Sequence, residues 1–494
     1  MAYKHGVYIS EQATSILPPV EVEAGIPFIV GTAPVGMVDE SNVNKPVLCY
    51  SYAEAVAAFG YVPPKKDEAS GLEKFEYSIS EFINSQFSLF GVAPVIIVNV
   101  LDPAKHKKAA ATTAITLDDV TGAITIEEPG IIPSSIKLSG PDAKEYVEGT
   151  DYALTFDAEG KPVITSLLCE MGHWCCPVGV ELTFAAEVCA PEMVEDTDVV
   201  GGVDVNGNKS GFELVSECFP RFRLVPGILI APGFSSDPSV AAVMSAKAAN
   251  INEHFRAISI VDVPTDTVKQ YTNVAAWKNN SNITDPLQVC CWPMLSLDGV
   301  AYHMSTQLAG LMGQVDGEND DVPYVSPSNK NLQMTATCLA DGSTVWLGPD
   351  NGAYLNGQGI VTAINFIGGW KCWGNRTACY PDNTDVKDAF IPIKRMMIWI
   401  GNTLVQTYWQ RVDFPLNRRQ IDTIVDSVNI WLNGLAAKQY ILGGRIEFNE
   451  DENPTTDLMD GKARFHVYVT PPSPNREIDF VLEYDVNYLE NLFA

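Results

Sequence analysis

Residues 223–266, RLVPGILIAPGFSSDPSVAAVMSAKAANINEHFRAISIVDVPTD, contain the pattern that decides the fold. Two short apolar runs flank an Ala-rich segment, and this order indicates strand, loop, helix, strand and loop. The helix is expected to begin at Ser236 or Asp237, with Pro238 in its first turn. The stretch therefore predicts one βαβ unit.

The same alternation continues on both sides of this unit. Buried strands are expected within 26–36, 93–100 and 285–295; helices are expected from Ser51, within 75–87 and within 300–316. Strands that alternate with helices favour an α/β layer with a mostly parallel sheet.

Three regions depart from the α/β pattern. Residues 104–200 contain short strands separated by Gly and Pro, which predicts a small β-sandwich or barrel. Within 105–200 there are 17 acidic and 6 basic residues, so this block is expected to face solvent. Two amphipathic helices are expected after residue 376, one over about 393–411 and one after Pro415.

The two ends of the chain have alternating apolar residues next to prolines. Residues 1–25 contain Pro18 and Pro19, which cannot donate to a sheet, so an extended arm or edge strand is expected. The last 34 or so residues predict two alternating strands joined by a Pro-rich link at 471–474. A strand without a partner in its own domain can pair with the sheet edge of another chain, although completing its own sheet is equally common.

Composition and charge limit the classes of function. The chain has 494 residues, 46% of them hydrophobic, and a formal net charge of −29. Such an excess of acidic residues argues against binding to nucleic acid or to an anionic membrane. The apolar run at 93–101 is too short to span a bilayer, and we expect neither a signal peptide nor membrane insertion. In that setting the eleven cysteines are expected to be reduced thiols.

The search for an enzyme or cofactor site gives only one weak candidate for catalysis. Asp262 follows a predicted strand, where α/β enzymes keep catalytic carboxylates, but Pro264 interrupts the phosphotransferase pattern Asp-x-Asp-x-Thr. We therefore expect Asp262 to cap a loop. Nucleophile elbows and Gly-rich phosphate loops are absent from the sequence. We predict that the chain is not an enzyme and needs no cofactor.

Metal-ligand residue types cluster in the β-rich block. They are Cys169, His173, Cys175, Cys176 and Cys189. The sequence has no Cys-x-x-Cys pair, and cysteine is commonly a small buried hydrophobic residue, so buried thiols are favoured over zinc. Whether these residues bind a metal stays open.

The decapeptide WGNRTACYPD, residues 373–382, has the look of a functional site. Its Asn-x-Thr sequon at Asn375 has no meaning for a chain that is not secreted. Gly374 would allow a backbone conformation closed to other residues, and Arg376 offers a planar fork of donors for carbonyls or carboxylates. Asp382 or Thr384 is expected to start the following helix.

Several segments together resemble one family. They are HGVYISEQ at 5–12, ILPPVEVEAGIPFIVGTAPVG at 16–36, NKPVLCYSYAEAVAAFG at 44–60, VPGILIAPGF at 225–234, ISIVDVPTD at 258–266, GGWKCWGNRTACYPD at 368–382 and the terminal stretch 461–493. They are similar to the contractile tail sheath proteins of P2-like myophages, tailocins and other contractile injection systems. The Trp-Gly-Asn-Arg-Thr segment is the most specific of these signals.

The resemblance implies a domain organisation and a fold. The implied fold is α/β (α+β overall), with a subtilisin-like α/β sheath core, an inserted small β-sandwich or barrel, a C-terminal α+β domain and extended arms. The implied ranges are an N-terminal arm at 1–25, the core at 26–103 and 206–375, the inserted surface domain at 104–205, the C-terminal domain at 376–470 and the exchanged C-terminal strand at 471–494.

The resemblance also implies a mechanical function, in which copies polymerise around a tail tube and contract to drive it through a cell envelope. The implied partners are further copies in stacked hexameric rings, the tube protein, and baseplate and tail-terminator proteins, in a virion tail or equivalent particle assembled in the bacterial host cytoplasm. An α/β hydrolase or protease and another tail or baseplate component are the alternatives.

Three sets of contact residues follow from the resemblance. Strand exchange between subunits is expected at Val7, Tyr8, Ile9, Val20, Val22, Ile478, Phe480, Leu482 and Tyr484. The junction between the core and the C-terminal domain is expected at Trp373, Gly374, Asn375, Arg376 and Thr377. Residues 376–434 contain 7 basic and 6 acidic residues, and Lys394, Arg395, Arg411, Arg418 and Arg419 are candidates for contacts with an acidic tube.

Overall fold

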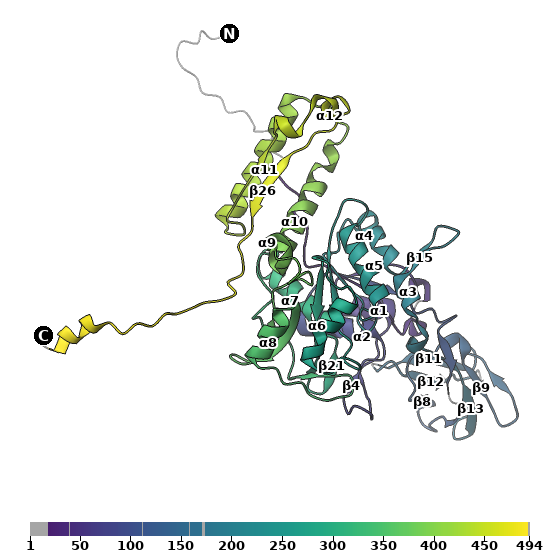
Figure 1. The fold of residues 1–494 in the computed structure, drawn as a ribbon. Helices are drawn as coiled ribbons and strands as arrows, with labels where there is room; N and C mark the ends of the chain where they lie inside the picture. The colour runs from purple at the N-terminus through teal and green to yellow at the C-terminus, as the bar shows by residue number, and fades with distance from the viewer. Residues whose placement is uncertain (1–17, 39, 111, 158, 170–172, 493–494) are drawn as a thin grey trace, which may run out of the picture.

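The structure, a computed structural model, describes residues 18–492 apart from 39, 111, 158 and 170–172 (Figure 1). Its centre is an eight-stranded sheet in the order β2-β5-β1-β17-β18-β19-β23-β24. These strands are β2 (Val47–Cys49), β5 (Val95–Asn99), β1 (Pro27–Gly31), β17 (Ile228–Ile230), β18 (Ile258–Asp262), β19 (Gln288–Cys291), β23 (Ile360–Asn365) and β24 (Trp370–Trp373). The six central strands are parallel and both edge strands are antiparallel, which confirms the predicted parallel α/β layer.

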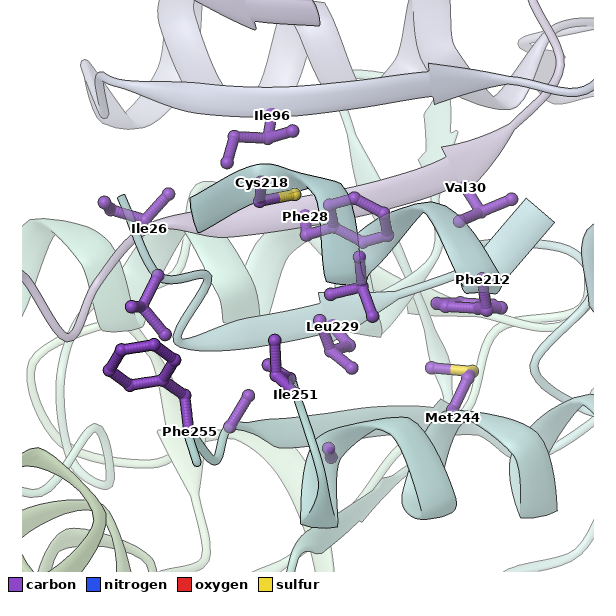
Figure 2. Packing of buried hydrophobic residues seen from close by; sticks show 14 of the residues in the cluster. Ile26, Phe28, Val30, Ile96, Phe212, Cys218, Leu229, Met244, Ile251 and Phe255 are labelled. Atoms are coloured by element: carbon purple, nitrogen blue, oxygen red, sulfur yellow. The ribbon is translucent and has the colours of Figure 1, made fainter. Parts of the chain in front are cut away.

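The central strands are apolar along their whole length because both faces of the sheet are covered. Every residue of β1, β5 and β18 is buried. On one face lie α1 (Tyr52–Phe59), α2 (Ser78–Ile83) and α7 (Met304–Gly317). On the other lie α4 (Val215–Phe222), α5 (Pro238–Ala249), α6 (Tyr271–Asn280) and α8 (Pro349–Asn356). Figure 2 shows part of this second layer, where Phe28 and Leu229 of the sheet lie near Phe212 and Met244.

The helix starts follow the predicted capping chemistry in two places. The Ser51 hydroxyl accepts a hydrogen bond from the Glu54 N–H at 3.3 Å, and α1 begins directly after it. At α5 the cap is Asp237, which accepts from the Ser239 N–H at 2.8 Å. The predicted helix at 300–316 is shorter than expected, because 300–302 form a strand.

Residues 104–200 form the short strands that the sequence predicts, in the lobe at the lower right of Figure 1. A four-stranded sheet contains β10 (Glu145–Tyr146), β9 (Lys137–Ser139), β13 (Glu181–Ala185) and β7 (Thr113–Thr116). A three-stranded sheet contains β11 (Tyr152–Phe156), β12 (Pro162–Ser166) and β8 (Ala123–Thr125). The two sheets share a hydrophobic cluster of their own, which includes Leu138, Ile164 and Phe184.

Smaller sheets and helices complete the core. They are the pair β6 (Lys107–Ala109) and β14 (Glu187–Cys189), the pair β15 (Gly202–Val203) and β16 (Lys209–Ser210), α3 (Asp196–Val200), and a five-stranded sheet of β22 (Ala336–Cys338), β20 (Met294–Leu297), β21 (Val300–Tyr302), β4 (Glu73–Lys74) and β3 (Lys65–Lys66).

The C-terminal region stands beside the core as two long helices and a hairpin (Figure 1). It contains α9 (Val386–Ala389), α10 (Ile391–Tyr408), α11 (Arg418–Ala437), β25 (Gly443–Glu447), α12 (Thr455–Met459) and β26 (His466–Thr470). Trp399 and Trp431 join the two helices with ring centroids 5.6 Å apart. Both amphipathic helices that the sequence predicts are thus present.

The expectation that all cysteines are reduced is wrong for two of them. Cys169 and Cys175 form a disulfide with Cα atoms 5.3 Å apart, because the Cys169 N–H donates to the His173 carbonyl at 2.7 Å and turns the chain back. The other nine cysteines are free and buried. Among the described residues no three His, Cys, Asp or Glu side chains gather as metal ligands.

Candidate functional site

The C-terminal segment leaves the molecule as an extended chain, at the lower left of Figure 1. Residues 471–485 have neither helix nor strand, and a 3₁₀ turn follows at 486–492. Ile478, Phe480, Leu482 and Tyr484 are 65–95% exposed. Exposing several large apolar side chains in one short segment is unfavourable in water, and such a segment marks a contact with something else.

The hairpin of β25 and β26 is a two-stranded sheet that packs on α11. The outer edge of β25 is occupied, because the side-chain oxygen of Asn429 accepts from the Ile446 N–H at 3.0 Å. In the described part of the chain, β26 has no strand along its outer edge. A row of unpaired main-chain groups of this kind is a template for a further strand.

Residues 20–24 lie along α10 and are bound to it by a row of side chains. The Val20 N–H donates to Thr407 Oγ1 at 2.9 Å, and the Val22 N–H donates to Thr403 Oγ1 at 3.4 Å. Trp399 Nε1 in turn donates to the Val22 carbonyl at 2.6 Å.

The spacing of this row explains how a helix can take the place of a neighbouring strand. The α10 contacts recur every four residues, at 395, 399, 403 and 407, which is a rise of about 6 Å. From Val20 to Val22 two residues of extended chain rise by nearly the same distance, so they meet Thr407 and Thr403 in turn. The longer side chains of Trp399 and Arg395 then reach the carbonyls of Val22 and Ala24. Sequence reasoning missed this row, and the signal was the presence of Arg395, Thr403 and Thr407 at multiples of four residues on a helix that is otherwise largely apolar.

A buried ion pair lies at the end of this row nearest the start of α10. Arg395 Nη1 lies 3.0 Å from Asp316 Oδ1 on α7, and Nη2 contacts the other carboxylate oxygen. Nη2 also donates to the Ala24 carbonyl at 3.1 Å. Arg395 thus ties the N-terminal segment, α7 and α10 together.

These contacts affect two of the predicted contact sets. Val20 and Val22 donate their main-chain N–H groups to α10 of their own chain, while the side chain of Val20 is half exposed. Arg395 is only 3% exposed, so its guanidinium is not on the surface as a tube contact requires. Lys394 is paired with Asp388 at 2.7 Å, while Arg418 and Arg419 are exposed. Val7, Tyr8 and Ile9 lie outside the described residues.

The decapeptide connects the edge strand β24 with α9 and α10. The Ile391 N–H donates to the Asn375 carbonyl at 2.9 Å, and Thr377 Oγ1 donates to the Asp388 carbonyl at 2.6 Å. Gly374 has φ of +140°, and a Cβ there would lie 2.6 Å from the Asn356 side-chain amide. Only glycine fits this position, as the sequence suggested.

A buried lysine fixes the decapeptide to the core. Lys278 Nζ donates to the Tyr380 carbonyl at 2.8 Å and to the Gln358 carbonyl at 2.6 Å. Burial lowers the pKa of Lys278. Because a buried cation must be paired or hydrogen-bonded, this lysine holds the chain where the decapeptide passes the end of α8.

Two expectations for the decapeptide are wrong in detail. The Arg376 guanidinium lies over the rings of Phe390 and Tyr380, at 3.7 and 4.3 Å from their centroids, instead of binding carbonyls or carboxylates. The following helix, α9, is capped by Asp385, which accepts from the Lys387 N–H at 3.1 Å, and not by Asp382 or Thr384.

Asp262 is saturated by structural hydrogen bonds. Its Oδ1 accepts from the Ser305 N–H at 2.8 Å at the start of α7, and its Oδ2 accepts from the hydroxyls of Ser305 and Ser235. Asp262 therefore caps a helix rather than a loop. It lines a cavity of about 210 Å³ together with Cys291 and His303.

The thiol in this cavity, Cys291, donates to Asp262 Oδ1 at 3.3 Å and is not paired with His303. His303 Nδ1 is paired with Glu81 at 2.8 Å, and in the described chain no hydroxyl or thiol is hydrogen-bonded to its ring. Burial holds the pKa of the Cys291 thiol well above its usual value, which disfavours the thiolate. Within the described residues no helix has the length and apolar character to cross a membrane.

Comparisons with curated proteins support the predicted resemblance. The chain is 28% identical to the tail sheath protein of Burkholderia phage BcepMu, over 99% of this chain and 98% of the relative. It is 28% identical to a prophage major tail sheath protein of Pseudomonas aeruginosa, over 62% of this chain and 75% of the relative. No family model matches the chain.

Comparisons with solved structures show the same fold at low sequence identity. The contracted sheath complex of an extracellular contractile injection system, PVC, matches with a TM-score of 0.57, 12% identity and 99% coverage of both chains. The contracted helical sheath of the anti-feeding prophage matches with a TM-score of 0.54 and 13% identity, over 98% of this chain and 100% of the other. The resemblance that the sequence predicts is confirmed, and the relatives are structural proteins rather than enzymes.

Proposed function

We infer that this protein is a structural subunit of a contractile tail sheath and not an enzyme. The observation that carries this conclusion is the similarity over the whole chain to a phage tail sheath protein, together with the sheath fold. The hydrolase alternative is not favoured, since Asp262 and His303 are both engaged in structural pairs. A tube or baseplate component is not favoured either, because the relatives are sheath proteins.

We propose that the subunits join by strand exchange. The donor is the exposed segment at 478–484, and the acceptor is the open edge of β26 in another copy. Main-chain hydrogen bonds would give the affinity, and alternate side chains would choose the register. The arrangement fits this role because the segment has exposed apolar side chains and is neither helix nor strand.

The proposed N-terminal exchange is narrower than the sequence suggests. Residues from Val20 onward are held by α10, so an exchanged N-terminal strand would have to lie before Pro18 and include Val7, Tyr8 and Ile9. Pro18–Pro19 and Pro471–Pro474 would then be the hinges at which the arms leave the body.

We further propose the domain organisation implied by the family. The eight-stranded sheet and its helices correspond to the subtilisin-like core, at 26–103 and 206–375. The β-rich block corresponds to the inserted surface domain at 104–205, and 376–470 to the C-terminal domain. Residues 373–377 form the junction, where Gly374 and the contacts of Asn375 and Thr377 fix the angle between β24 and α10.

In the proposed mechanism, hexameric rings of the subunit stack around a tail tube in a virion tail assembled in the host cytoplasm, between baseplate and tail-terminator proteins. The extended sleeve is a kinetically trapped state. Contraction repacks body against body while the exchanged strands hold the copies together, and the tube is driven through the target envelope. Arg411, Arg418 and Arg419, at the end of the helix pair, are the proposed tube contacts.

Negative-stain electron microscopy of the purified protein, alone and with tube protein added, tests this function. Hollow sleeves in either sample support the sheath function. If neither sample contains sleeves over a range of ionic strength, the proposed function is wrong.

A further inference from the structure

A cavity of about 560 Å³ lies between the C-terminal linker and the core. The linker forms one side with residues 472–476, and the decapeptide forms another with Trp373–Arg376 and Tyr380. Core loops around 324–330 and 353–357 complete the lining. The cavity therefore occupies the place where the body of the subunit meets its exchanged arm.

The charge of this cavity is opposite to that of the protein. Lys330, Arg376 and Arg476 line it, and no acidic residue does. The chain as a whole has 61 acidic and 32 basic residues, so a cavity whose charged lining residues are all basic is unusual for it. Hydroxyl and amide side chains such as Ser326, Ser328 and Asn475 add hydrogen-bonding groups to the same walls.

Arg376 has an unused set of donors in this cavity. Its guanidinium rests on the faces of Phe390 and Tyr380, which fixes the plane of the group but leaves its in-plane N–H groups free. Among the described residues it has no carboxylate or carbonyl partner within hydrogen-bond distance. A planar, immobilised guanidinium is well suited to donate two parallel hydrogen bonds to a carboxylate.

A second arginine makes an anion still more favourable. Arg376 and Arg476 line the same cavity. Burial lowers the pKa of Arg376, and the positive charge of Arg476 lowers it further. Among the described residues, Arg476 is paired with the adjacent Glu477, at 3.1 Å, and both side chains are largely exposed. An anion between Arg376 and Arg476 would relieve their repulsion.

We propose that this cavity binds carboxylate side chains from an acidic segment of a second copy of the chain. This rests on the proposed function, which supplies the second copy. The acidic surplus of every copy, including 17 acidic against 6 basic residues at 105–200, gives the required complementary charge. Bound there, a neighbour's carboxylate would hold the linker against the core and so fix the direction in which the arm leaves.

Direct binding to the full-length protein tests the cavity without any need for assembly. The probe is a hexaglutamate peptide, followed by isothermal titration calorimetry at low ionic strength, with inorganic phosphate as the comparison. Arg376→Gln and Arg476→Gln are each expected to weaken hexaglutamate binding by about tenfold, since charge-assisted hydrogen bonds are lost. Arg464→Gln, an exposed arginine outside the cavity, is the matched control and is expected to change binding by less than about twofold.

Three results would overturn the site. Equal weakening in all three variants would mean general surface attraction, and binding of phosphate without hexaglutamate would mean another class of anion. Absence of binding to the native protein would remove the site altogether. Because Arg376 also packs on two rings, its variant is checked by thermal unfolding, and the exposed Arg476 gives an answer independent of folding.

Assembly distinguishes a second copy from a free small carboxylate. Hexaglutamate is expected to compete with assembly, and Arg476→Gln to shorten or abolish sleeves that Arg464→Gln still forms. If hexaglutamate binds but changes neither sleeve length nor yield, the second copy is not the occupant. If the native protein forms sleeves but does not bind hexaglutamate, the proposed function stands and the carboxylate site is wrong. If it binds hexaglutamate but forms no sleeves, the site stands and the proposed function is wrong.

Discussion

The two ends of this chain share a pattern of alternating apolar residues near prolines but have opposite surroundings. Residues 20–24 are bound along α10 by Arg395, Trp399, Thr403 and Thr407. The segment at 478–484 has its apolar side chains in water. The difference teaches that an alternating segment next to prolines does not by itself become an exchanged strand, since a helix with suitably spaced polar groups can bind it first.

The largest effect expected from this comparison is on assembly. Deletion of 471–494 should abolish sleeves, because the proposed donor strand is lost, as seen by negative-stain electron microscopy. The free energy of unfolding should change by about 1 kcal/mol or less, since most of the removed side chains are exposed and Pro471 alone among the described ones is buried. Normal sleeves from the truncated chain, with tube protein present, would contradict the comparison.

Loss of a contact with the bound N-terminal segment should lower the stability of the subunit itself. Arg395→Ala removes one partner of a buried ion pair and the bond to the Ala24 carbonyl, and should lower the free energy of unfolding by about 3–5 kcal/mol. Chemical denaturation measures the loss, and Arg411→Ala, outside the buried pair, is the control. A loss below about 1 kcal/mol would mean that the N-terminal segment is not held as described.

The pH dependence of the free energy of unfolding reports on the body of the subunit, where His303 is paired with Glu81, and not on its arms. Burial by itself would lower the pKa of His303, but Glu81 at 2.8 Å outweighs it and raises the pKa to about 9. A group whose pKa is raised on folding stabilises the protein fully below its unfolded pKa, near 6.5, and this contribution is lost as the pH rises through 9.

The free energy of unfolding should therefore fall by about 2–3 kcal/mol between pH 6.5 and pH 10. The fall should be the same in the protein without 471–494, and much reduced in His303→Gln. Denaturation at several pH values measures it. An equal fall in His303→Gln would assign the effect to other groups.

The smallest effect is expected at the end of the helix pair. Reversal of Arg418 and Arg419 to Glu should leave stability within about 0.5 kcal/mol, because both residues are exposed. Tube-templated assembly should weaken at low salt, and the difference from the native protein should shrink as salt is raised, since salt screens attraction and repulsion alike. Unchanged assembly at low salt would count against these tube contacts.

The sequence by itself determined the parallel sheet, the two long helices and the resemblance to tail sheath proteins. These depend on periodicity, on caps such as Ser51 and Asp237, and on the segment at 373–377, all of which are local in the chain. The same local signals misplaced the helix start at Asp385 by one to three residues, because boundaries depend on which side chain reaches a free N–H.

Only the tertiary structure decided what the individual charged residues do. Arg395 is a surface cation by sequence pattern, but Asp316 meets it from α7, 79 residues away in the chain. Arg376 has a planar set of hydrogen-bond donors, but its guanidinium lies over the rings of Phe390 and Tyr380. The same residue lines the basic cavity. A side chain's partner is set by the elements packed around it, and the local sequence contains no record of segments that meet only after folding.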